Sequence, residues 1–139
     1  NRMRAECPDL LARLYEDFIF DRQREHAPDD VMTIEHPLFT WDGSRLLGRL
    51  SKRQVHGGYA LAGKAMDEQA AAALTALETI MTAPGMRKKF YFEPGQIQIV
   101  NNKTCGHSRP AFTDWPEPER HRNLTRLWLR HEGRVFYNG

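Results

Sequence analysis

The chain has 139 residues, a length that fits one domain, and its 40% hydrophobic and 27% charged content lies within the range of globular proteins. A formal net charge of only +2 gives no general attraction to nucleic acid or to a membrane surface, and no apolar run approaches the length of a transmembrane span. Cys7 and Cys105 belong to no disulfide framework, which favours a reducing compartment, so we expect a cytoplasmic protein.

The first half of the chain predicts a helix, a loop and a hairpin. Asp9 can cap a helix whose apolar residues fall at helical spacing, namely Leu10, Leu11, Leu14, Tyr15 and Phe18. A polar stretch up to Asp30 predicts a loop. Extended segments at 32–34 and 37–41 precede the turn signal Asp42-Gly43, and a further extended segment follows at 45–50.

The middle of the chain predicts one more helix. Residues 54–63 are expected to be irregular because Gly57-Gly58 would interrupt a regular element. Asp67 predicts the start of the clearest helix, which carries an apolar stripe, runs to about Thr82 and ends before Pro84-Gly85.

The second half predicts strands. Alternating runs occur at 89–92 and 96–100, separated by Pro94-Gly95, and the longest run is at 122–130. A short edge strand is expected at 134–137. The fold class we expect is therefore mainly β with flanking helices, as in a jelly-roll sheet with helices on one side.

Polar and charged side chains gather around two of the predicted strands. His107 lies in a polar loop directly after the run that ends at Val100. Arg122 and Arg126 are four residues apart in a strand pattern, so their side chains would point to one face. The planar guanidinium of arginine grips a carboxylate with two hydrogen bonds. A histidine near paired arginines suits a metal ion and a bound dicarboxylate.

Each of these residues also has an ordinary structural interpretation. One histidine after a strand is more often a hydrogen-bonded histidine than a metal ligand. The arginines could lie on a solvated face, paired with Asp114, Glu117, Glu119 and Glu132. Asn102 is expected in a turn, and Arg109 could hold its loop by pairing with Asp114.

At these positions the chain resembles a known family. It is similar to the C-terminal half of the iron(II)- and 2-oxoglutarate-dependent oxygenases of the taurine dioxygenase and clavaminate synthase type. The residues that carry the similarity are an Asn-x4-His step, a His-x-Arg, an Arg-x3-Arg and a loop, at Asn102, His107, Arg109, Arg122, Arg126 and 111–116. The similarity covers most of residues 8–137 and is strongest at 95–129.

The resemblance implies a double-stranded β-helix (jelly-roll) fold, here only its C-terminal part, and a role for each site residue. His107 would be an iron(II) ligand. Arg126 would bind the distal carboxylate of 2-oxoglutarate, and Arg122 the carboxylate beside the keto group or the substrate side; which arginine does which stays open. Asn102 and Arg109 would support the site or touch substrate. No side chain is assigned as a catalytic acid, base or nucleophile.

The reaction implied by the resemblance couples oxidative decarboxylation of 2-oxoglutarate by O2 to hydroxylation of a small-molecule substrate. Iron(II) would be the cofactor and 2-oxoglutarate the co-substrate, and the protein would supply ligand geometry, orientation and a dry pocket. No nucleic acid or membrane partner is expected. The identity of the substrate and association into a homo-oligomer are left open.

One departure from the family concerns the other two iron ligands, which form a His-x-Asp or His-x-Glu motif. An acid is absent two residues after each histidine, at His26, His36, His56, His107, His121 and His131. We therefore expect residues 1–139 to be the C-terminal part of a single oxygenase domain, folded as half of a barrel. Its partner would be the N-terminal segment that carries the motif. Two alternatives are a non-catalytic jelly-roll module and a binding domain for an anionic small molecule.

Overall fold

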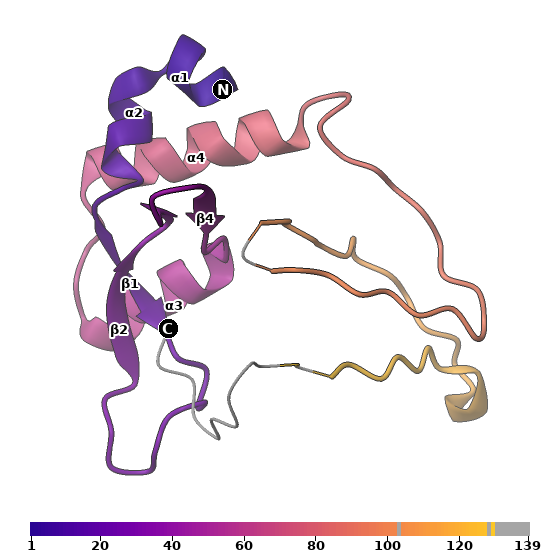
Figure 1. Cartoon of the computed structure of the whole chain (residues 1–139). Coiled ribbons are helices and arrows are strands. Elements are labelled where there is room, and N and C mark those ends of the chain that lie inside the picture. Colours follow the sequence, from indigo (N-terminus) through magenta and orange to yellow (C-terminus); the bar gives the residue numbers. More distant parts are fainter. Residues whose placement is uncertain (103, 128, 130–139) are drawn as a thin grey trace.

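The computed structural model of the chain describes residues 1–102, 104–127 and 129, and the statements below concern these residues. Their α-helices and strands all lie before residue 83 and form one packed body. After this body the chain runs out into long loops, which contain a single turn of 3-10 helix, η1 (Pro118–Arg120) (Figure 1).

Two short helices open the chain, α1 (Arg2–Glu6) and α2 (Pro8–Arg13). The predicted helix start at Asp9 and its continuation to Phe18 are wrong. Cys7 is the N-cap of α2 and Pro8 takes the first helical position, where its missing N–H costs no hydrogen bond. The helix stops at Arg13 because Phe18 belongs to a strand that buries aromatic residues.

The first sheet pairs β1 (Asp17–Asp21) with β2 (Thr33–Pro37) in antiparallel register, with Phe18 opposite His36 and Phe20 opposite Ile34. β1 begins within the predicted helix and continues where a loop was predicted, so the loop prediction is wrong at residues 19–21. Phe18 and Phe20 have no exposed surface, and this burial explains why the segment is extended instead of solvated.

The predicted hairpin at Asp42-Gly43 is confirmed. It joins β3 (Phe39–Trp41) to β4 (Leu46–Gly48), with Thr40 opposite Leu47. The Asp42 carboxylate accepts 2.9 Å hydrogen bonds from the backbone N–H groups of Ser44 and Arg45, and these hold the pKa of Asp42 far below its usual range. Gly43 takes a φ of +98°, which favours glycine at that position.

Residues 52–62 form a helix, α3 (Lys52–Ala62), so the prediction of irregular structure is wrong. Ser51 caps its start and Gly63, in the left-handed region, ends it. Gly58 does not break the helix; it allows the helix to press against β1. A Cβ atom on Gly58 would overlap the carbonyl oxygen of Ile19. The glycine pair therefore marks a close helix–strand contact.

The helix predicted from Asp67 is confirmed as α4 (Glu68–Thr82). The Asp67 carboxylate accepts the Ala70 N–H at 2.7 Å, which caps the helix. Its buried face packs against α1, α2 and the sheets and consists of Ala70, Ala73, Leu74, Leu77 and Ile80. Figure 1 shows α4 lying across the body between α1/α2 and the strands.

The strands predicted after α4 are not formed. The described residues of 89–92, 96–100 and 122–130 have no strand structure, although the turn at Pro94-Gly95 is present, closed by the Gln96 N–H on the Glu93 carbonyl at 3.1 Å. Residues 128, 130 and 134–137 lie outside the described part. An alternating segment becomes a strand only beside a partner strand, and none lies beside these segments in the described part of the chain.

The described residues thus form a mixed α and β body, with helices packed on two two-stranded antiparallel sheets, and not a mainly β fold. The jelly-roll remains what the family resemblance implies. In the part of the chain that the structure describes, no helix is both long and apolar enough to cross a lipid bilayer.

Candidate functional site

His107 lies in the loops that follow α4, directly after a tight turn. The Asn101 carbonyl accepts the N–H groups of Thr104 and Cys105, at 3.2 and 3.0 Å, so Asn102 sits in a turn as predicted. The next residue, Gly106, lies close to the packed body, since a Cβ built on it would lie 3.5 Å from the Met81 Cε atom. The backbone beside His107 therefore lies near the end of α4, while the histidine itself is exposed.

A complete metal site is not formed by the described residues. Among them, no group of three or more histidine, cysteine, aspartate or glutamate side chains is close enough to hold a metal ion. The imidazole of His107 is a donor that suits iron(II), but it would supply one ligand only. The described residues therefore supply only one of the protein ligands that an iron centre needs.

Two of the predicted site arginines, Arg109 and Arg122, lie beside the ring of Phe112. The guanidinium carbon of Arg109 lies 4.1 Å from the centroid of the Phe112 ring, and that of Arg122 lies 5.3 Å from it. Both distances are within the range of cation–π attraction. The ring therefore lies beside two predicted site residues, Arg109 and Arg122, that are thirteen residues apart in the sequence.

The loop around this ring is closed by its own polar contacts. The Asp114 carboxylate accepts the backbone N–H of Arg122 at 2.8 Å, which brings the two ends of residues 114–122 together. Arg109 was predicted either to pair with Asp114 or to touch substrate; its guanidinium lies on Phe112. Phe112 was given no role from the sequence. Its spacing of three residues from Arg109 was a usable signal, but its contact with Arg122 depends on the closure of the loop.

In a second stacked pair in the same loop, the charge of the arginine is balanced by a carboxylate. The Arg120 guanidinium lies 3.5 Å from the centroid of the Trp115 indole and 3.6 Å from the Glu117 carboxylate. By contrast, no described carboxylate lies within ion-pair distance of the Arg109 or Arg122 guanidinium. These two positive charges are held on one ring and can meet an anion from outside the loop.

Of the predicted site residues, Arg109 and Arg122 share the Phe112 ring. Both are exposed, as are Asn102, His107 and Arg126.

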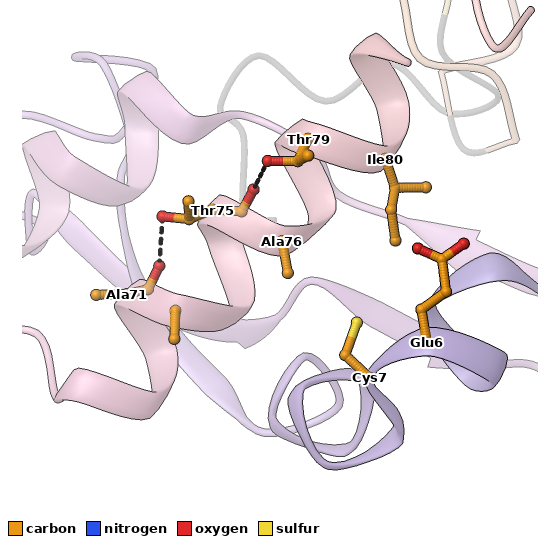
Figure 2. Close-up of a pocket in the computed structure, with 8 residues that line it drawn as sticks. Glu6, Cys7, Ala71, Thr75, Ala76, Thr79 and Ile80 are labelled. Atoms are coloured by element: carbon orange, nitrogen blue, oxygen red, sulfur yellow. Dashed lines mark hydrogen bonds between the residues drawn. The ribbon is translucent and has the colours of Figure 1, made fainter. Parts of the chain in front are cut away.

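The hollow in the packed body lies elsewhere. It is a groove of about 590 Å³ between α1/α2 and α4, shown in Figure 2, lined by Glu6, Cys7, Ala71, Ala72, Thr75, Ala76, Thr79 and Ile80. The hydroxyls of Thr75 and Thr79 donate 2.9 Å hydrogen bonds back to the helix carbonyls of Ala71 and Thr75. Glu6 pairs with Arg2 at 2.8 Å. The groove lacks the convergent polar groups of a reaction site.

Comparison with known sequences gives the chain its family. Residues 1–128 match the family described as "Taurine catabolism dioxygenase TauD, TfdA family". The chain belongs to the TauD, TfdA family. The match spans the packed body and the loops with His107, Arg109, Arg122 and Arg126, so the family resemblance is confirmed and extends further toward the N-terminus than the motifs that suggested it.

One relative of this chain is the FR-33289 synthase of Streptomyces rubellomurinus (strain ATCC 31215). The two are 29% identical over 140 residues, which is 98% of this chain and 41% of the synthase. The chain therefore spans less than half the length of the relative it matches. Membership of the TauD, TfdA family supports an iron- and 2-oxoglutarate-type oxygenase at the level of the family.

Proposed function

We propose that the protein containing this chain is an iron(II)- and 2-oxoglutarate-dependent oxygenase that hydroxylates a small-molecule substrate. The observation that carries the proposal is the match of residues 1–128 to a dioxygenase family. Iron(II) together with 2-oxoglutarate would supply the oxidising chemistry that amino-acid side chains lack. The chain's own contribution is to bind and orient.

Two kinds of side chain carry that contribution. His107 would give one imidazole ligand to the iron. Arg122 and Arg126 would bind the carboxylates of 2-oxoglutarate, because a guanidinium makes paired, charge-assisted hydrogen bonds to a carboxylate. The exposed Arg122 guanidinium, which has no described carboxylate beside it, supports this role.

We also propose that the site is completed by a further segment of polypeptide with the His-x-Asp or His-x-Glu pair. Apart from Val100, every described residue from Pro84 to Leu129 is exposed. These include eleven large hydrophobic residues, namely Met86, Phe90, Tyr91, Phe92, Ile97, Ile99, Phe112, Trp115, Leu124, Leu127 and Leu129. So much exposed apolar surface favours burial against other strands. The greater length of the synthase relative is consistent with this proposal.

The proposal is tested by turnover of 2-oxoglutarate to succinate in the natural full-length protein supplied with iron(II). His107→Ala should abolish succinate formation, while His121→Ala, an equally exposed histidine of the same loops, should leave it unchanged. Unchanged turnover in His107→Ala would refute the ligand role. Binding of 2-oxoglutarate without any turnover in the unaltered protein would favour an anionic small-molecule binding domain instead.

A further inference from the structure

The ring of Phe112 has a role that the proposed oxygenase function does not itself assign. Two guanidiniums, those of Arg109 and Arg122, lie 4.1 and 5.3 Å from its centroid. Both cations lie within the range of attraction to the negative face of the ring. An anionic ligand that met both of them would offset their mutual repulsion.

The loop is held in this arrangement by contacts that do not involve the Arg109 and Arg122 guanidiniums. The Asp114 carboxylate accepts the backbone N–H of Arg122 at 2.8 Å. This hydrogen bond fixes the backbone of Arg122, while its guanidinium lies beside the ring. Glu117 is engaged by Arg120 at 3.6 Å. The nearby acids thus order the loop, and the Arg109 and Arg122 charges face outward to solvent.

We propose that Phe112 is a positioning residue, whose ring sets Arg109 and Arg122 as a paired receptor for an oxyanion, here a carboxylate of 2-oxoglutarate. The identity of the anion rests on the proposed function; the paired receptor rests on the geometry. A long arginine side chain loses rotamer freedom when it binds a ligand, and contact with the ring removes part of that freedom beforehand. Phe112 therefore acts on affinity through the two arginines and does not touch the reacting atoms.

The test measures binding of 2-oxoglutarate by calorimetry, without oxygen and with manganese(II) in place of iron, in the natural full-length protein. Phe112→Leu keeps an apolar side chain but removes the ring, and should weaken binding about 4- to 25-fold, from about two- to fivefold for each guanidinium. Phe112→Tyr should restore most of the affinity. Trp115→Leu is the matched control, because its ring stacks on the ion-paired Arg120, and should change affinity less than about twofold.

A second variant separates the ring's charge distribution from its shape. Pentafluorophenylalanine introduced at position 112 keeps the size of the ring but reverses its quadrupole, so it should weaken binding as much as leucine does. Wild-type affinity in the leucine and pentafluoro variants would overturn the positioning role. Absence of binding in the unaltered protein would instead refute the proposed function.

Discussion

The guanidinium of Arg13 donates a 2.9 Å hydrogen bond to Oδ2 of Asp67, the residue that caps α4. Arg13 is buried in α2, with its guanidinium 4.4 Å from the Phe18 ring centroid, and it also donates to the Asp17 carbonyl at 3.3 Å. The one side chain of Arg13 therefore ties α2, β1 and the start of α4 together. The same carboxylate accepts the Ala70 N–H, so Asp67 serves two elements at once.

The first prediction concerns pH and Asp67. The Arg13 hydrogen bond and then the Ala70 N–H lower the pKa of Asp67 below its ordinary value. A carboxyl whose pKa is lower in the folded than in the unfolded chain stabilises the fold above the unfolded pKa, near ~3.9. That contribution is lost as the pH falls through the folded pKa.

Asp67→Asn keeps the cap but removes the charge of the exposed partner of the pair, so it should cost about 0.5–1 kcal/mol at neutral pH. In urea unfolding the difference from the unaltered chain should begin to shrink near pH ~4 and vanish at lower pH. Glu68→Gln, at the same end of α4, is the control for a general effect of charge at the helix start. A difference that persists unchanged at acid pH would contradict the ion pair's role.

The second prediction concerns the contact between α3 and β1. Gly58→Ala should destabilise the packed body by about 2 kcal/mol or more, because a Cβ would overlap the Ile19 carbonyl oxygen and lie 2.7 Å from the Phe20 carbonyl carbon. The overlap involves backbone atoms, which cannot move aside as a side chain can.

Gly57→Ala is the matched control for this prediction. The atoms nearest to its added Cβ belong to the Asp21 side chain, at 3.1 Å, and the gain in helix propensity, about 1 kcal/mol, opposes that crowding. We expect a change within about 1 kcal/mol by urea unfolding. Equal stability of the two variants would show that α3 does not press on β1 through Gly58.

The third prediction concerns the arginines assigned to 2-oxoglutarate. Arg122→Ala and Arg126→Ala should each weaken its binding by about 2–4 kcal/mol, or roughly 30- to 1,000-fold, because each removes a charge-assisted, two-pronged contact. Lysine should restore only part of the affinity, since a point charge lacks the fork. Arg120→Ala is the control, since its guanidinium is already paired with Glu117. Calorimetric affinities unaltered in both alanine variants would exclude the assignment.

The sequence predicted those elements whose signals are local. Asp67 as a cap and Asp42-Gly43 as a turn act through nearby backbone groups, and both were placed correctly. α3 was missed because Gly58 looks like a helix breaker when its neighbour β1 is unknown. β1 was missed because the alternation of Phe18 and Phe20 is short and follows a helical pattern.

The prediction of strands after α4 was wrong for a different reason. Alternation of Ile97 and Ile99 reports that a segment suits a sheet, but a strand also needs a partner beside it, and both side chains are exposed here. For the site, Arg109 and Arg122 were found by their motifs. The ring between them was not, because a contact of Phe112 with Arg122 depends on the closure of the loop by Asp114.

We propose that this TauD, TfdA family chain serves a 2-oxoglutarate-dependent oxygenase. The most direct measurement follows isotopic oxygen in the natural full-length protein, supplied with iron(II), 2-oxoglutarate and ¹⁸O2. Oxidative decarboxylation of the keto acid by O2 places one labelled oxygen atom in each succinate. We predict singly labelled succinate, and none with His107→Ala. Succinate formed without the label, or no consumption of 2-oxoglutarate by the iron-loaded protein, would contradict the account.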